Sequence, residues 1–119
     1  MLVEQSRLKN LRTLYLSNTE IDDSAADYIA QLTSLQTLWI GHTNVGDRFI
    51  TGISSLRNLE DLNVTGTQIT NVPESAICGF PKLEHFYASD TSMDYDTIRR
   101  INAYVDANKL VELDRITKQ

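Results

Sequence analysis

Apolar residues and one threonine recur along this chain at a constant interval of 24 positions. Seven columns keep this interval over four copies without insertion or deletion. The columns contain Leu8, Leu32, Leu56 and Phe80; Leu11, Leu35, Leu59 and Leu83; Leu14, Leu38, Leu62 and Phe86; Leu16, Ile40, Val64 and Ala88; Thr19, Thr43, Thr67 and Thr91; Ile21, Val45, Ile69 and Met93; and Ile29, Ile53, Ile77 and Ile101. This repeat predicts stacked units, each of which buries its apolar face against its neighbours.

Each repeat divides into an extended half and a helical half. The first half reads L-x-x-L-x-L-x-x-T-x-I, and its alternation of apolar and polar positions predicts a β-strand with one buried face. The second half has helical spacing over about a dozen residues, and in the first copy its apolar face comprises Ala25, Ala26, Ile29 and Leu32. Between the halves lie turn and helix-capping residues, namely Asp22, Asp23 and Ser24; Gly46 and Asp47; Thr70 and Asn71; and Asp94.

The segments L-R-T-L-Y-L-S-N-T-E-I, L-Q-T-L-W-I-G-H-T-N-V and L-E-D-L-N-V-T-G-T-Q-I resemble leucine-rich repeats. The resemblance covers residues 8–93 and continues more weakly to the C-terminus. It implies an α/β fold, a right-handed β-α solenoid with a concave parallel sheet of about five strands and helices on the convex side. One column departs from the family pattern, because threonine stands where Asn or Cys is usual. In the family that side chain bonds to the backbone where the chain leaves the strand, and a threonine hydroxyl can do the same.

The two ends of the chain depart from the regular repeat. Residues 2–8 align with the end of a preceding helix and would form a thin cap. Either the chain is part of a longer solenoid, or a partner or second copy covers its first edge. Near the other end, residues 96–108 predict the longest helix, residues 110–113 a fifth strand and residues 114–119 a polar tail. Pro73 predicts a short turn or 3₁₀ segment in place of a helix in the third repeat.

The outward positions of the predicted strands form rows across the concave face. The middle row contains Tyr15, Trp39, Asn63, Tyr87 and Asp114, and the row before it contains Thr13, Thr37, Asp61, His85 and Glu112. An exposed tryptophan beside tyrosines is typical of protein-binding surfaces, because aromatic side chains bury a large area at low entropic cost. The alternative is that Tyr15 and Trp39 only stack as cross-strand neighbours and stabilise the sheet.

Charge is distributed unevenly over the same surface. Basic residues lie near the first strand, and acidic residues gather toward the other end, namely Glu60, Asp61, Glu84, Asp90, Glu112 and Asp114. This favours a protein partner with a basic or mixed-charge surface. A merely solvated face is the alternative.

Composition and charge exclude several classes of function. The 119 residues carry a net charge of −5, which argues against general nucleic-acid binding. One cysteine and two histidines leave little material for disulfides or a metal centre, so we expect no metal and no cofactor. No apolar run is long enough to span a membrane. His85 lies near Asp61, but no serine or cysteine nucleophile has a clear place beside that pair, so we expect no enzyme.

The sequence therefore predicts a single domain over residues 1–119. Its repeats cover about 11–34, 35–58, 59–82 and 83–109, with a C-terminal cap at 110–119. We expect a cytoplasmic protein-interaction module that binds a protein or peptide on its concave face, as a monomer or an edge-mediated dimer. The alternative is a structural or regulatory segment of a larger protein or complex, with any catalytic domain outside this chain.

Overall fold

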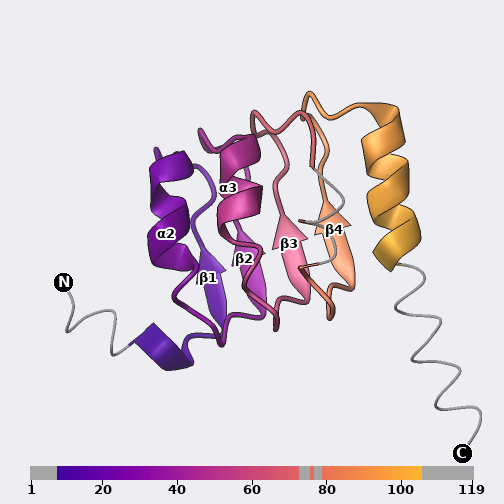
Figure 1. Cartoon of the computed structure of the whole chain (residues 1–119). Helices are drawn as coiled ribbons and strands as arrows, with labels where there is room; N and C mark the ends of the chain where they lie inside the picture. The colour runs from indigo at the N-terminus through magenta and orange to yellow at the C-terminus, as the bar shows by residue number, and fades with distance from the viewer. Residues whose placement is uncertain (1–7, 73–75, 77–78, 106–119) are drawn as a thin grey trace, which may run out of the picture.

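Four short strands pair into one parallel sheet in a computed structural model of the chain, which describes residues 8–72, 76 and 79–105. The strands are β1 (Thr13–Tyr15), β2 (Thr37–Trp39), β3 (Asp61–Asn63) and β4 (His85–Tyr87), and they lie side by side in chain order (Figure 1). Each pairing joins residues that are 24 positions apart. The register is therefore the one that the repeat predicts.

Helical segments of different lengths connect the strands. Before β1 lies η1 (Leu8–Asn10), and between β1 and β2 lie η2 (Asp23–Ala25) and α2 (Ala26–Ile29). Between β2 and β3 lies α3 (Asp47–Gly52), beside α2, and residues 95–105 are helical after β4 (Figure 1). The expectation of about a dozen helical residues is wrong for α2 and α3. In α3 the last residue is Gly52, where an added Cβ would lie 2.7 Å from the Ala26 Cβ, so this end packs closely on the preceding repeat.

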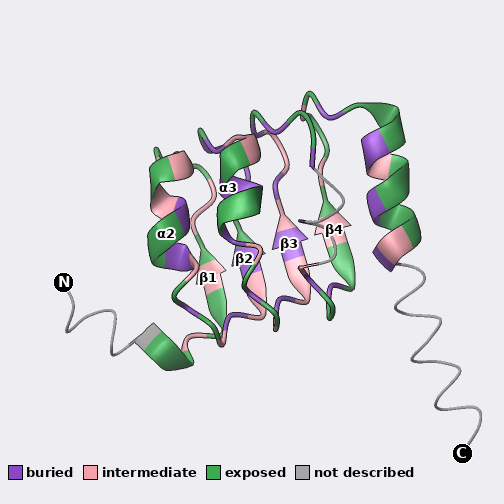
Figure 2. Ribbon diagram, viewed as in Figure 1, coloured by how far each residue is buried: buried purple, intermediate pink, exposed green. Residues whose placement is uncertain are grey.

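The hydrophobic core lies between the sheet and the helical segments. In the second and third repeats the inward strand residues are almost completely buried, namely Leu35, Leu38, Ile40, Leu59, Leu62 and Val64. In the first and fourth repeats Leu14, Leu16 and Phe86 are only partly buried. Figure 2 shows the same gradient, with buried positions on β2 and β3 and none on β1 or β4. Each repeat therefore depends on its neighbours for the burial of its apolar face.

The threonine column forms the backbone bonds that the sequence predicts for it. In every repeat the hydroxyl Oγ1 donates to the carbonyl oxygen three residues earlier, at 2.7 Å from Thr19, Thr43 and Thr67 and at 2.9 Å from Thr91. Thr43 and Thr67 are buried, so their hydroxyls need this acceptor. The bond spans the point where the chain leaves the strand.

The residue before each threonine adopts a left-handed backbone conformation. The φ values are 64° at Asn18, 55° at His42, 72° at Gly66 and 55° at Asp90. Asn, Asp and His are the side chains that tolerate this region best after glycine. At Gly66 a Cβ would also collide with the His42 imidazole of the preceding repeat, which would have to shift, so both the backbone conformation and the space favour glycine there.

Aspartates connect the turns of successive repeats. Asp22 caps η2 by accepting from the Ser24 amide at 2.9 Å, as predicted. Asp47, by contrast, accepts from the next repeat, from the Thr70 amide at 2.7 Å and hydroxyl at 2.6 Å and from the Asn71 amide at 3.2 Å. Asp23 similarly accepts from the Gly46 amide at 2.6 Å. The predicted role of Asp47 as a cap of its own helix is therefore wrong, because its oxygens bind one repeat further along the stack.

Hydrogen bonding lowers the pKa of Asp22, Asp47 and Asp94. At Asp47 partial burial raises the pKa, but the Thr70 and Asn71 bonds outweigh it and hold the pKa below the ordinary value of 3.8. At Asp94 the Thr97 backbone amide is the largest cause of a lowered pKa, and at Asp22 it is the Ser24 hydroxyl. All three carboxylates favour the folded state in their charged form.

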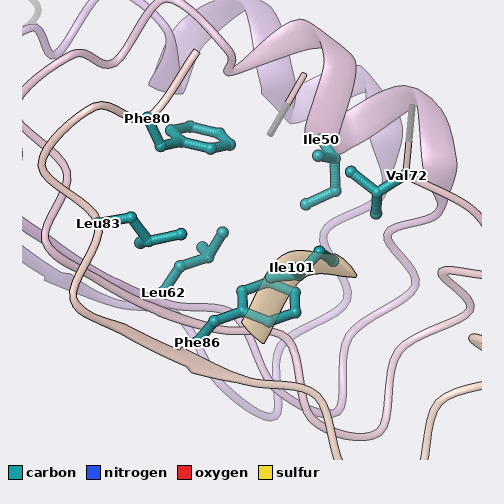
Figure 3. Close-up of a pocket in the computed structure, with 7 residues that line it drawn as sticks. All are labelled: Ile50, Leu62, Val72, Phe80, Leu83, Phe86 and Ile101. Carbon is teal, nitrogen blue, oxygen red and sulfur yellow. The ribbon is translucent and has the colours of Figure 1, made fainter. Parts of the chain in front are cut away.

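Residues 95–105, the helical half of the fourth repeat, pack against the core of the stack. Ile101 and Val105 are buried, Ile98 and Tyr104 are partly buried, and the Tyr104 hydroxyl donates to the Phe80 carbonyl at 3.4 Å. A cavity of about 10 Å³ lies beside this helix. Figure 3 shows the side chains that line it, namely Ile50, Leu62, Val72, Phe80, Leu83, Phe86 and Ile101. This volume is about the minimum for one water, and the described residues that line it offer no polar partner.

Several predictions fall on parts of the chain outside the described residues. These are the N-terminal cap before residue 8, the turn at Pro73, the end of the last helix at Asn108, the fifth strand at 110–113 and the polar tail at 114–119. The described residues contain one strand in each of four repeats.

Replacement of Thr43 by valine should cost about 1–2 kcal/mol in the free energy of unfolding. Valine has nearly the same shape, but the Ile40 carbonyl loses the buried hydroxyl that donates to it. Urea denaturation at pH 7 measures the loss. Thr19→Val is the matched control, because Thr19 makes the same bond at an exposed position and its replacement should cost less than about 0.5 kcal/mol. Equal costs at the two positions would contradict the role of burial.

Replacement of Asp47 by asparagine should lower the free energy of unfolding at pH 7 by about 1 kcal/mol, because the charged acceptor of three bonds is lost. The Asp47 pKa is lowered on folding, so its stabilisation is present above pH 3.8 and declines as the pH falls through the folded-state value. Urea denaturation curves of wild type and Asp47→Asn should therefore converge toward pH 3. Asp27→Asn, an exposed change on α2, should leave stability nearly unchanged. A constant difference between pH 7 and pH 3 would contradict this assignment.

Candidate functional site

The face of the sheet that points away from the core carries the predicted site, and we call it the open face. Eight outward side chains of β1–β4 compose it, namely Thr13, Tyr15, Thr37, Trp39, Asp61, Asn63, His85 and Tyr87. The strand register places Thr13, Thr37, Asp61 and His85 in one row and Tyr15, Trp39, Asn63 and Tyr87 in the next. These are the two rows that the repeat predicts. The remaining predicted members, Glu112 and Asp114, lie outside the described residues.

Tyr15 and Trp39 form an aromatic pair across β1 and β2. Their ring centroids lie 4.7 Å apart with an interplanar angle of 42°. Tyr15 is 62% exposed and Trp39 is 37% exposed. The pair therefore stabilises the sheet as cross-strand neighbours do, while a substantial part of both rings still faces solvent. Cross-strand stacking and an available contact surface coexist here.

A hydrogen bond holds the indole of Trp39 from its other side. The Nε1–H donates to Oδ1 of Asp61 at 3.1 Å, from β2 to the adjacent strand β3. Asp61 is paired in register with Thr37, so the contact runs diagonally across two strands. Trp39 thus lies between the Tyr15 ring and the Asp61 carboxylate, and its orientation is restricted before any partner arrives. Sequence reasoning placed all three residues on this face but did not find this bond.

The two remaining strands contribute differently to the open face. On β3 the Asn63 side chain accepts from the Thr65 amide at 3.0 Å, so its carbonyl oxygen is engaged with its own chain. On β4 the rings of His85 and Tyr87 are nearly parallel, with centroids 6.3 Å apart, and both residues are exposed. The open face therefore has aromatic groups on β1, β2 and β4, with the smaller polar side chains of β3 between them.

The charge gradient predicted from the sequence follows the strand order. Arg12, Gln36, Glu60 and Glu84 precede β1, β2, β3 and β4, respectively. Backbone bonds keep this column in register, because the carbonyls of Arg12, Gln36 and Glu60 each accept two amides from the next repeat. The ion pairs found within residues 8–72, 76 and 79–105 join Asp96 to Arg99 and Arg100 on the last helix. Glu60, Asp61 and Glu84 thus have no cationic partner within that part of the chain.

Asp61 and His85 each contact another residue of the open face. They are neighbours in register on β3 and β4, but Asp61 bonds to Trp39 and the His85 ring lies beside Tyr87. Within the described ranges no group of three or more His, Cys, Asp or Glu side chains could hold a metal ion. In the same ranges no helix has the length and hydropathy needed to cross a bilayer. Among the described residues, the open face presents aromatic surface and carboxylates that have no cationic partner.

Comparisons with known proteins agree with the repeat pattern. Residues 9–58 match the family described as Leucine Rich repeats (2 copies). A comparison with curated proteins gives no match. Eleven chains of solved structure match, among them Leiomodin-1 Actin-Binding Site 2 (ABS2), with a TM-score of 0.74. That match covers 96% of this chain and 75% of the other at 14% sequence identity, so the likeness is one of fold.

The fluorescence of Trp39 tests the geometry of the site directly, because it is the single tryptophan of the chain. We expect a collisional quencher such as acrylamide to reach it, since 37% of the residue is exposed. Tyr15→Ala and Asp61→Ala should each increase the quenching constant, because each removes a contact that covers or orients the indole. Asp27→Asn should leave the constant unchanged. A blue-shifted and quencher-resistant emission from the wild type would show that Trp39 faces the core.

Proposed function

Because this chain is a leucine-rich-repeat protein, we propose that it is a non-catalytic interaction module that binds a protein or peptide on the open face of its sheet. The observation that carries the proposal is the exposed Tyr15–Trp39 pair, whose tryptophan Asp61 already orients. Large aromatic side chains contribute most of the binding energy at many protein interfaces. On this face they occupy outward positions, where packing of the core does not require them.

Prior ordering of Trp39 favours binding energetically. A side chain that becomes immobile at an interface loses about 0.5–1.5 kcal/mol of conformational entropy. The Tyr15 ring and the Asp61 carboxylate already restrict the indole, so part of this entropy is lost when the chain folds and not when a partner binds. The parallel sheet beneath fixes the spacing of the contact groups. The open face is therefore a preorganised surface rather than one that must form on contact.

Charge supports a partner with a basic surface. Glu60, Asp61 and Glu84 lack cationic partners within the described chain and lie at the starts of β3 and β4. Such a field would steer a basic partner toward the aromatic centre of the face. The similar leiomodin structure is an actin-binding site, which supports a protein ligand for this fold, although it does not identify the ligand of this chain.

The same proposal includes the larger features that the sequence predicts. These are a single solenoid domain over residues 1–119, curvature that makes the open face concave, and a monomer or an edge-mediated dimer. A cytoplasmic location is supported by the single cysteine, which leaves no internal disulfide for an oxidising compartment to maintain.

A second candidate is a structural or regulatory segment that makes its contacts through the ends of the stack. The observation that favours it is the partial burial of Leu14 on β1 and Phe86 on β4, in contrast with Leu38 and Leu62 between them. Apolar side chains at the ends of a repeat stack need a cover, from a cap or from another molecule.

Capture of partners from an extract of the source organism distinguishes the two candidates. The full 119-residue chain serves as bait, and mass spectrometry identifies what it retains. A Tyr15→Ala/Trp39→Ala double variant should fold with modest destabilisation and lose at least about tenfold in captured partner, because two central anchors are removed. Tyr28→Ala is the matched control, since Tyr28 is 57% exposed but lies on α2. Full capture by a folded double variant would exclude the open face and favour the ends of the stack.

A further inference from the structure

We infer that Trp39 and Asp61 together receive an arginine side chain of the partner. The inference rests on the proposed function and specifies the group that the open face recognises. Its basis is that the accessible ring of Trp39 is hydrogen-bonded to the Asp61 carboxylate, whose second oxygen has no described partner.

Only one of the two carboxylate oxygens of Asp61 accepts a described hydrogen bond. Its Oδ1 accepts from the Trp39 indole, and no described contact engages Oδ2. An ionised carboxylate has about four lone-pair sites, so Oδ2 can accept from an incoming cation without breaking the bond to Trp39. Binding would then complete an arrangement that already exists, in which the indole and the guanidinium share one carboxylate. A purely apolar anchor would desolvate Oδ2 without a partner, which is unfavourable.

The exposed part of the indole supplies the second attraction. A cation over the face of a tryptophan ring, within about 6 Å of the ring centroid, is attracted by the ring quadrupole. Because Asp61 accepts from the indole N–H, its carboxylate lies at the edge of the ring, and a guanidinium that donates to Oδ2 gains this attraction by extending from there over the exposed part of the ring. Strand spacing extends the argument to β4, because β2 and β4 lie about 10 Å apart and a group above β3 lies about 5 Å from each. Tyr87 is 44% exposed on β4 and stands on the other side of this position.

Arginine fits this arrangement better than lysine does. A guanidinium is flat, stacks on aromatic rings and keeps N–H groups at its edge for a carboxylate, and it is hydrated more weakly than an ammonium group. The site offers an aromatic surface and an edge acceptor together, so both properties of arginine are used. The carboxylates of Glu60 and Glu84 add a negative potential that draws either cation toward the face.

Blocked pentapeptides of sequence Gly-Gly-Arg-Gly-Gly, and the same peptide with lysine or citrulline at the centre, test the inference. Trp39 emission and two-dimensional NMR of the folded chain report binding at the site. We expect saturable binding of the arginine peptide at millimolar concentration, about threefold weaker binding of the lysine peptide, and no binding of the neutral citrulline peptide. Amide shifts should be confined to β2, β3 and β4.

Asp61→Asn should weaken the arginine peptide about fivefold, because a charged acceptor becomes neutral. Asp27→Asn removes the same charge from exposed α2 and should change affinity by less than about twofold at roughly 150 mM salt. Equal weakening by both changes would show that diffuse charge attracts the peptide, and equal affinity for the lysine peptide would show that the ring has no part. Either result, or no binding at all, overturns the inference.

These outcomes are separate from the test of the proposed function. If the Tyr15→Ala/Trp39→Ala variant loses its captured partner while the arginine peptide fails to bind, the open face is the binding surface and the arginine assignment alone is wrong. If that variant keeps its partner although the peptide binds at Asp61, the proposed function is wrong and the site has another ligand.

Discussion

The constant step of 24 residues is the constraint on which the rest of this structure depends. Since each repeat returns the chain to the next strand in register, a residue's column determines whether it is buried and which residues it meets. Hydrogen bonds between repeats follow the same spacing. The carbonyls of Arg12, Gln36 and Glu60 each accept two amides from the next repeat, and Asp47 accepts from the loop that contains Thr70. Each repeat is stabilised by contact with its neighbours. The inward residues of β2 and β3, which have a neighbour on both sides, are therefore buried, and those of β1 and β4 are only partly buried.

Two kinds of polar contact keep the step constant. Within a repeat, the threonine hydroxyl bonds to the carbonyl three residues earlier and fixes the exit from the strand. Between repeats, Asp23 and Asp47 accept amides of the following turn, 23 or 24 residues away. The residue before each threonine adopts a left-handed backbone conformation within this turn. Hydrophobic burial is non-directional, so these directional bonds add to the apolar pattern in holding the register.

The sequence was sufficient to predict the register and the residues of the open face because both follow from periodicity. It did not predict the lengths of α2 and α3, since helical spacing marks an apolar face and not the residues at which a helix ends. The bond between Trp39 and Asp61 was also missed, because a diagonal contact depends on side-chain torsions that no column encodes. The role of Asp47 was predicted wrongly for a related reason. In a stacked structure such a residue can bond to its own helix or to the turn of the next repeat, and the sequence does not distinguish the two.

Differences among the four repeats identify the positions that the fold leaves free. Inward columns hold similar apolar residues in every copy, because the core accepts little else. The outward column of Tyr15, Trp39, Asn63 and Tyr87 has no such uniformity, and neither does the column of Arg12, Gln36, Glu60 and Glu84. One backbone geometry thus supports several different side chains, and packing does not explain which residue stands where. Recognition by the proposed binding face would explain this choice of residues, because a partner distinguishes the features in which the strands differ. These features are the Tyr15–Trp39 pair at one side, the Asp61 carboxylate at the centre and the negative charge of Glu84 at the other side.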